Sequence, residues 1–272
     1  MTIAMQVKQL VSMARFNEAL ALGEQRLVEV TGKEKQLLLQ SCFISARNLG
    51  EGALTKKYYE QFQRELHACQ TFEEELAYLH VEIIYALMLH DVGHAREKIK
   101  RFHLLTANVQ DQPIVAYTAG AILYYQILYF YEVDEYVNAI KLYNDIHPNM
   151  MAQISMENPA LYLHIHSYLA SAYIHLSKWR TAEQLLRELE TLELSKTKPQ
   201  LGAKCALMQQ FLNYALYRTP IDFAQCETLF EACQPFERLT YNCLMKDMRY
   251  MLAQKPNDAM QQLYEQWCHT AC

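Results

Sequence analysis

The chain has 272 residues, a formal charge of −5 at pH 7 and a hydrophobic content of 51%. This hydrophobic content excludes a disordered chain, and the negative charge, without any long run of Lys and Arg, excludes a basic nucleic-acid-binding surface. Only seven Gly and seven Pro are present, fewer than a β-rich or doubly wound fold needs for its turns. The composition therefore predicts an all-α fold, built as one elongated array over residues 1–272.

Apolar periodicity, capping residues and proline positions predict the helices in chain order. Thr71 and Glu74 form a capping box, and Asn158 and Thr219 precede prolines at first helical positions. Residues 147–158 are predicted to form a loop that packs through its methionines. The expected helices span residues 2–14, 16–30, 34–49, 53–69, 72–90, 92–107, 113–131, 134–146, 159–176, 179–194, 199–217, 220–233, 236–253 and 257–269.

The segment between Asp111 and Glu132 is uncharged and long enough to cross a bilayer. Tyr124, Tyr125 and Gln126 would then lie near the middle of the membrane, whereas Tyr prefers the interfaces. A buried helix is the better interpretation, and we expect no membrane partner. The start of the chain lacks the apolar core of a signal peptide, which predicts a cytoplasmic protein.

Eight cysteines are scattered along the chain, and none forms the C-x-x-C spacing of a zinc or redox site. We therefore expect reduced thiols. His90 and His94 are four residues apart, but a predicted turn separates their helices. No H-E-x-x-H motif or phosphate-binding loop is present. The sequence predicts no catalytic residues, no metal site and no cofactor.

Residues 169–189, LASAYIHLSKWRTAEQLLREL, place small Ala170 and aromatic Tyr173 in one helix, Trp179 at a turn and Ala182 in the next helix. This pattern resembles the tetratricopeptide (TPR) repeat, in which a small residue lets paired helices approach closely. Similar copies are marked by alanines whose spacings are 76, 44, 43, 42 and 35 residues, and a degenerate copy is expected near Lys56 and Lys57. The marker positions are Ala19, Ala95, Ala139, Ala182, Ala224 and Ala259.

The resemblance implies a right-handed α–α superhelix of about seven helix pairs that binds a ligand on its concave face. Carried over to this chain, the concave groove is rich in Tyr, His, Asn and Gln and has no Lys or Arg clamp. The alternative is that the Tyr side chains fill space between helices. The expected groove residues are Tyr124, Tyr125, Leu128, Tyr131, His164, Tyr168, Ser171, His175, Gln209, Asn213 and Tyr217.

The function that follows is a non-catalytic, regulatory module that binds an extended peptide or a partner helix. One alternative is the sensory region of a bacterial signalling protein with a GGDEF output domain, and another is an intracellular receptor for a peptide pheromone. An all-helical enzyme is the remote alternative. A homodimer through the last helix pair is also predicted, with Tyr241, Met245, Met248, Tyr250 and Met251 at the interface.

Overall fold

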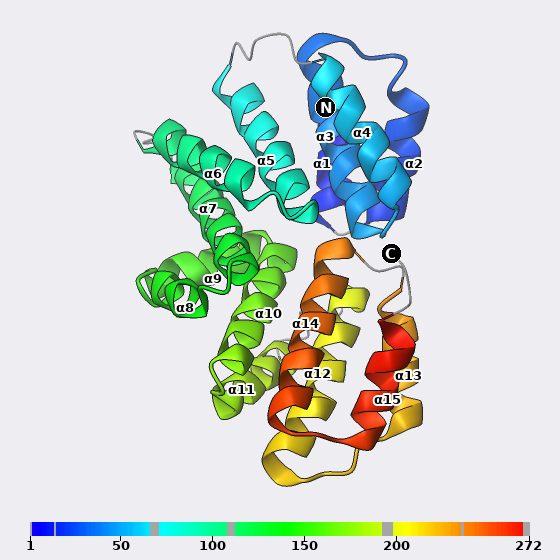
Figure 1. Ribbon diagram of the computed structural model, residues 1–272. Helices are drawn as coiled ribbons and strands as arrows, with labels where there is room; N and C mark the ends of the chain where they lie inside the picture. Colours follow the sequence, from blue (N-terminus) through cyan, green and yellow to red (C-terminus); the bar gives the residue numbers. More distant parts are fainter. Residues whose placement is uncertain are drawn as a thin grey trace. The chain divides into compact units, whose positions relative to one another are not determined.

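The computed structural model describes residues 2–13, 15–65, 71–107, 112–191, 198–234 and 237–268, with the backbone alone given for 112–118 and for 191. Over these ranges the regular structure consists of fifteen α-helices and no strand (Figure 1). The predicted all-α class is confirmed. Each of the fourteen predicted helices corresponds to an observed helix, and one further helix is present.

The chain divides into two compact units, Met1–Thr118 and Ala119–Cys272, and the boundary falls within helix α7 (Gln112–Glu132). Unit 1 contains α1 (Ile3–Ser12), α2 (Phe16–Arg26), α3 (Gly32–Asn48), α4 (Gly52–Glu65), α5 (Phe72–Met88) and α6 (Val92–Thr106). Unit 2 contains α8 (Tyr136–Asn144), α9 (Pro148–Glu157), α10 (Pro159–His175), α11 (Trp179–Thr191), α12 (Pro199–Tyr217), α13 (Phe223–Ala232), α14 (Arg238–Gln254) and α15 (Asp258–Trp267).

In unit 1, helix α3 is the centre of the packing and contacts α1, α2, α4 and α5, while α6 pairs with α5. Gly23 on α2 lies against Cys42 on α3. A Cβ atom added at Gly23 would come within 2.4 Å of the Cys42 sulfur. Glycine is therefore required for the close approach of these two helices.

In unit 2, helix α10 has the central position and contacts α8, α9, α11, α12 and α14. Nearly every residue from Leu163 to Ile174 is buried, as expected of a helix that is apolar on all sides. Phe211, Met248 and Trp267 belong to the same core. Because α10 is covered by neighbours from several directions, its polar side chains must find partners inside the protein.

The same turn joins four helix pairs, two in each unit. Gly50, His90, Asp134 and Ser177 each adopt a positive φ of 56–71°. At each turn this residue donates its N–H to the carbonyl three positions earlier, and the next residue donates to the carbonyl five positions earlier. These are the bonds of a Schellman motif, which ends a helix with a left-handed residue.

The residue five positions after each of these turns is small and buried. It is Thr55, Ala95, Ala139 or Ala182, and Thr55 directly precedes Lys56 and Lys57, near which a degenerate copy is expected. Ala224 is exposed on α13, and Cys226 is the buried small residue of that helix. A small side chain allows each second helix to pack closely on the first.

The predicted caps are confirmed at two helices, and the predicted Thr219 cap is wrong. The Thr71–Glu74 capping box is present, and Asn158 caps α10 with Pro159 in its first turn. Helix α13 instead begins at Phe223 with Asp222 as its cap, because Asp222 offers a carboxylate to the free N–H groups. Asp111, which precedes the uncharged segment, lies outside the described residues.

The predicted loop at 147–158 is wrong, because residues 148–157 form helix α9. The His147 imidazole accepts a hydrogen bond from the N–H of Asn149, and Pro148 occupies the first turn. Proline is favoured there, since that N–H has no helical partner. A proline-initiated helix of this length is easily missed, because it contains only a few apolar positions.

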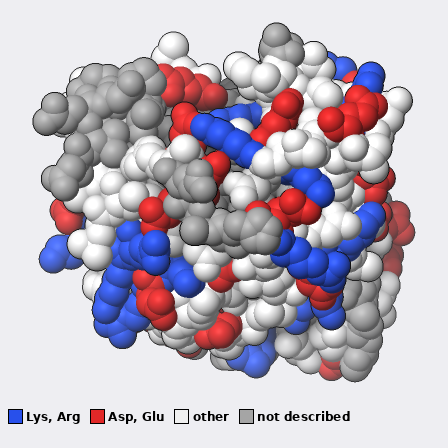
Figure 2. All heavy atoms as spheres, turned by 90° about the horizontal axis from the view of Figure 1, so that it is seen from above, with Lys and Arg blue, Asp and Glu red and all other residues white. Residues whose placement is uncertain are grey.

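Lys and Arg side chains are interspersed with Asp and Glu on the face drawn in Figure 2. Elsewhere in the described residues, ion pairs form within one segment, as between Arg26 and Glu29, or between neighbouring helices, as between Arg101 and Glu75. Among the helices that the structure describes, including the apolar α7, none has the length and apolar character needed to cross a membrane.

Candidate functional site

Most of the predicted groove residues are buried in unit 2. Tyr124, Tyr125, Leu128 and Tyr131 on α7, and His164, Tyr168 and Ser171 on α10, are all buried. Gln209 and Asn213 are half-buried, the His175 side chain is 7% exposed, and Tyr217 is 54% exposed. These positions fit the alternative in which the Tyr side chains fill space between helices.

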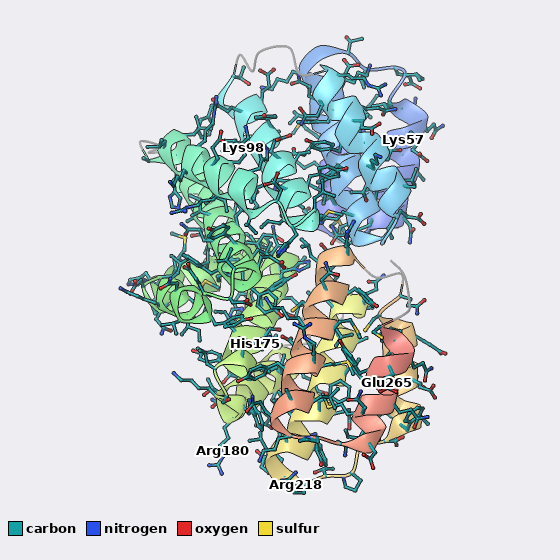
Figure 3. The ribbon with its side chains drawn as sticks, in the orientation of Figure 1. Lys57, Lys98, His175, Arg180, Arg218 and Glu265 are labelled. Carbon is teal, nitrogen blue, oxygen red and sulfur yellow. The ribbon has the colours of Figure 1, made fainter. Side chains whose placement is uncertain are left out.

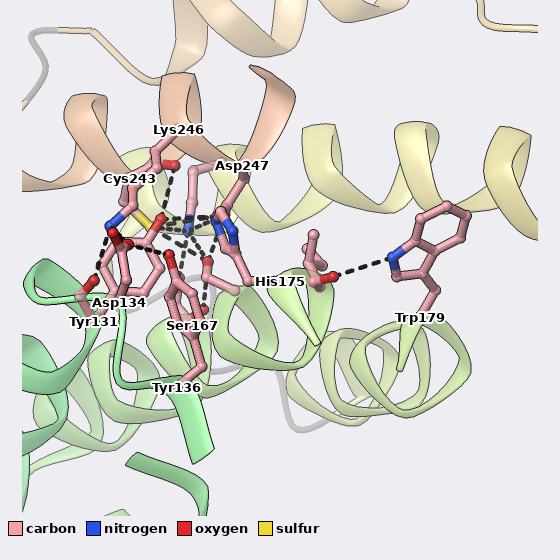
Figure 4. Close-up of polar contacts among 12 residues, drawn as sticks. Tyr131, Asp134, Tyr136, Ser167, His175, Trp179, Cys243, Lys246 and Asp247 are labelled. Carbon is pink, nitrogen blue, oxygen red and sulfur yellow. Dashed lines mark hydrogen bonds and ion pairs between the residues drawn. The ribbon is translucent and has the colours of Figure 1, made fainter. Parts of the chain in front are cut away.

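Tyr131, Ser171 and His175 of the predicted groove converge on Asp247 of α14 (Figure 4). The Tyr131 hydroxyl donates to Asp247 Oδ1 at 2.8 Å, and His175 Nε2 donates to the same oxygen at 3.0 Å. Ser171 Oγ donates to Asp247 Oδ2 at 2.6 Å. Helices α7, α10 and α14 therefore share one carboxylate, which is 0% exposed.

A buried cation, Lys204 of α12, completes this cluster. Its Nζ lies 4.0 Å from Asp247 Oδ2 and donates to Ser167 Oγ at 3.1 Å and to Ser171 Oγ at 3.2 Å. Ser171 thus accepts from the ammonium and donates to the carboxylate, bridging the ion pair. The Cys243 sulfur is 3.3 Å from Lys204 Nζ.

The electrostatics of the cluster favour the charged pair. Burial alone would raise the pKa of Asp247, but the hydrogen bond from His175 and the charge of Lys204 hold this pKa below its usual value. Burial opposes the charge on Lys204, yet Cys243 and Asp247 raise its pKa. Burial raises the pKa of the Cys243 thiol to about 11. A carboxylate and an ammonium therefore coexist inside the unit with a neutral thiol.

Asp247, His175 and Ser171 are the residue types of a hydrolase triad, but their hydrogen bonds differ from that arrangement. A triad serine donates to the histidine, which is its base, whereas Ser171 donates to Asp247. His175 is enclosed by the rings of Tyr131, Tyr136 and Tyr250. The contacts of the cluster join four helices, α7, α10, α12 and α14.

The outer edge of the cluster is formed by Lys246 beside His175, which Figure 3 shows on α10 facing α14. Lys246 Nζ donates to the Tyr131 carbonyl at 2.8 Å, pairs with Asp134 at 2.7 Å and lies 4.5 Å from the centre of the Tyr131 ring. The cation thus caps the C-terminal end of α7. These partners of Lys246 belong to unit 2.

The other predicted groove residues also have partners inside unit 2. His164 Nε2 is 2.5 Å from Lys198 Nζ, and its ring contacts that of Tyr124. Gln209 donates to Asn213 at 3.0 Å and to Glu183 at 3.3 Å. For the predicted dimer interface, Met248 and Met251 lie in the core, while Tyr241, Met245 and Tyr250 are partly buried against it.

A cavity of about 600 Å³ lies on the surface of unit 2 where α8, α9 and α10 meet. This size is within the range typical of ligand pockets. The described residues of its lining include no charged side chain and are mainly apolar and aromatic, and Met156 among them is 85% exposed. We call it the α8–α10 pocket, and it is lined by Tyr143, Asn144, Ile146, Pro148, Met151, Ala152, Ser155, Met156 and Tyr162.

His166 links the two tyrosines of the α8–α10 pocket. Its Nδ1 lies 2.9 Å from the Tyr162 carbonyl, and its Nε2 lies 2.9 Å from the Tyr143 hydroxyl. A carbonyl only accepts, so Nδ1 carries the proton, and burial lowers the pKa of His166. Nε2 therefore accepts the Tyr143 proton. The Tyr162 ring stacks on the imidazole at 3.9 Å.

Glu188 of α11 adds negative charge near this pair. Burial, the neighbouring tyrosines and the Glu188 carboxylate together raise the pKa of Tyr143 to about 12. Burial and Glu188 also raise the pKa of Tyr162. Both hydroxyls are thus neutral, and a carboxylate that is itself exposed influences the aromatic side of the pocket.

The sequence predicted neither Asp247, Lys204 nor the pocket tyrosines as site residues. The partners of Asp247, Lys204 and Tyr143 include residues distant in the chain, so no local spacing marks these sites. The methionines of residues 147–158 were the one available signal for the pocket, and they were expected only to pack.

Among the described residues, no group of three or more His, Cys, Asp or Glu side chains is placed to hold a metal ion. No protein-family model matches the chain, and comparison with curated proteins gives no match. The resemblance to TPR repeats therefore rests on the sequence pattern.

Proposed function

We propose that the chain is a cytoplasmic, non-catalytic binding module of TPR-like helix pairs arranged as a superhelix. The support for the TPR-like pairs is the turn found at Gly50, His90, Asp134 and Ser177, spaced by 40, 44 and 43 residues. Each turn is followed by a small buried residue. The count of about seven pairs extrapolates this spacing over the rest of the chain.

The partner segment binds in the α8–α10 pocket, and the single observation that carries this proposal is the pocket lining. Met151 and Met156 offer flexible, polarizable contacts that adapt to different side chains, and the tyrosines add rigid aromatic surface with polar tips. Such a lining suits a bulky side chain of a peptide or partner helix. The groove residues on α7 and α10 are buried and are less suited to the role.

The test is to fill the pocket. Ala152 lines it and is exposed on α9, so Ala152→Trp blocks the pocket without disturbing the core. Ala224→Trp, at an exposed position on α13 in the same unit, is the matched control. Peptides selected from a phage-displayed random library against the wild-type chain are expected to bind Ala152→Trp at least tenfold more weakly, a loss of about 1.4 kcal/mol. Ala224→Trp is expected to bind normally.

Fluorescence anisotropy with the labelled peptides gives the dissociation constants, and circular dichroism confirms that both variants are folded. Selected peptides that bind Ala152→Trp as tightly as the wild type would overturn the assignment of the pocket. A selection that enriches no family of sequences would count against the binding module itself.

A further inference from the structure

We propose that the α8–α10 pocket recognises a lysine or arginine side chain of its partner, and this inference rests on the proposed binding function. The first element of the site is an apolar wall. Ile146, Pro148 and Met151 line one part of the cavity. Such a surface packs well against the methylene stem of a long basic side chain, which buries its stem and keeps its charge near polar groups.

The second element is a hydrogen-bond acceptor whose direction is fixed. His166 Nδ1 is committed to the Tyr162 carbonyl, so the Tyr143 hydroxyl must give its proton to His166 Nε2. The Tyr143 oxygen then retains only acceptor capacity toward the pocket. A ligand group that donates, such as an ammonium or a guanidinium, satisfies this oxygen, whereas a carboxylate cannot.

The third element is the aromatic and negative character of the same side. Tyr143 and Tyr162 present rings to the cavity, and a cation over a tyrosine face is attracted by the ring. Glu188 influences both tyrosines and His166. Lys141 is the basic residue of α8, but it lies two positions before Tyr143 and so faces another direction. Among the residues that the structure describes, no Lys or Arg lines the pocket.

The apolar wall, the Tyr143 acceptor and the aromatic side near Glu188 thus all favour a cationic ligand group on an apolar stem. An acidic or neutral apolar side chain would satisfy at most one of these features. The pocket therefore selects partners in which a basic residue is presented on an exposed segment, and it discriminates against the same segment with a neutral residue of equal length.

The experiment compares two acetylated and amidated pentapeptides, Ala-Ala-Lys-Ala-Ala and the same sequence with norleucine in place of lysine. The full chain is labelled with ¹³C at its methionine methyl groups, and the Met151 and Met156 signals are assigned by single Met→Leu replacements. We expect the lysine peptide to shift both signals and to bind about tenfold more tightly than the norleucine peptide.

Two variants test the chemistry of recognition. Tyr143→Phe keeps the ring and removes the acceptor, and it is expected to weaken lysine binding about fivefold while leaving norleucine binding unchanged. Glu188→Gln is expected to weaken lysine binding two- to fivefold, more so at low salt. Glu190→Gln, at another exposed position on the same helix, is the matched control and should have no effect.

Equal affinity for the two peptides, with shifts at Met151 and Met156, would overturn the preference for a basic side chain and leave the binding pocket intact. Absence of shifts with both peptides would also overturn the inference. Failure of the binding function itself would be seen separately, as insensitivity of the library-selected peptides to Ala152→Trp.

Discussion

Two carboxylates buried in the middle of helices, Glu82 in unit 1 and Asp247 in unit 2, are accommodated in different ways. Glu82 accepts hydrogen bonds from Tyr59 at 3.0 Å, from Gln63, and from His94 at 2.6 Å. The His94 side chain is 37% exposed. The Glu82 carboxylate is therefore separated from solvent by one imidazole, which bonds the carboxylate and is itself partly exposed.

Asp247 has no such connection to solvent. Its histidine partner, His175, has a side chain that is only 7% exposed, and the nearest cation is the buried Lys204. Glu82, one side chain away from water, is accommodated by hydrogen bonds from Tyr59, Gln63 and a partly exposed histidine. Asp247, which has no such access to water, is paired with the buried ammonium of Lys204, because an unpaired buried charge is costly.

The largest expected effect comes from removing that counter-charge. Lys204→Met leaves Asp247 ionised and buried, and we expect it to lower the free energy of unfolding by about 3–5 kcal/mol. Adding Asp247→Leu removes the unpaired charge as well and is expected to recover most of the loss. Urea unfolding followed by helical circular dichroism measures both variants.

The exposed Lys141→Met is the control for this change and should alter stability by less than about 0.5 kcal/mol. Additive losses in the Lys204→Met/Asp247→Leu variant would contradict the role of Lys204 as the counter-charge. The loss of stability in Lys204→Met would then be due to lost packing and not to an unpaired charge.

An intermediate effect is expected from the two histidines that bond these carboxylates. His175→Ala removes a buried hydrogen bond to a charged group and should cost about 1.5–3 kcal/mol. His94→Ala removes a partly exposed partner, which water can replace, and should cost less than about 1 kcal/mol. Urea unfolding of the two variants under identical conditions measures the difference. Equal losses would show that solvent access does not distinguish the two sites.

The smallest effect on stability is expected from the Schellman turn, a type of turn that occurs in both units. Gly50 has a φ of 71° and Ser177 a φ of 56°, a region that costs other residues about 1 kcal/mol. Gly50→Ala is therefore expected to destabilise by about 1 kcal/mol, and Ser177→Gly to stabilise by up to about 0.5 kcal/mol. Ser177→Ala separates the loss of the hydroxyl, which bonds Tyr250, from the backbone effect. Thermal unfolding that changed in the same direction for both turns would disagree with a shared geometry.

The helices and several of their ends could be predicted from the sequence because the signals are local. Thr71 and Glu74 are three residues apart and cap α5 on their own. The Schellman turn at Ser177 follows a helix whose apolar pattern ends there. Helix α9 was missed because its signal, Pro148 after His147, is equally compatible with a loop.

The candidate site could not be predicted in the same way. The partners of Asp247 include Tyr131, Ser171 and Lys204, each more than forty positions away in the chain. Helical periodicity tells which side of α10 is apolar, but it does not tell which helix covers it. The tyrosines assigned to a groove have the same polar tips whether they meet a ligand or another helix.

The sequence by itself determined the all-helical class, the positions of fourteen helices within a few residues and the buried small residues Ala95, Ala139 and Ala182, since their signals are patterns within one or two helical turns. Only the tertiary structure decided which polar side chains are sealed inside unit 2 and which line the α8–α10 pocket. Burial depends on which helices pack together, and that choice sums many weak, non-local contacts.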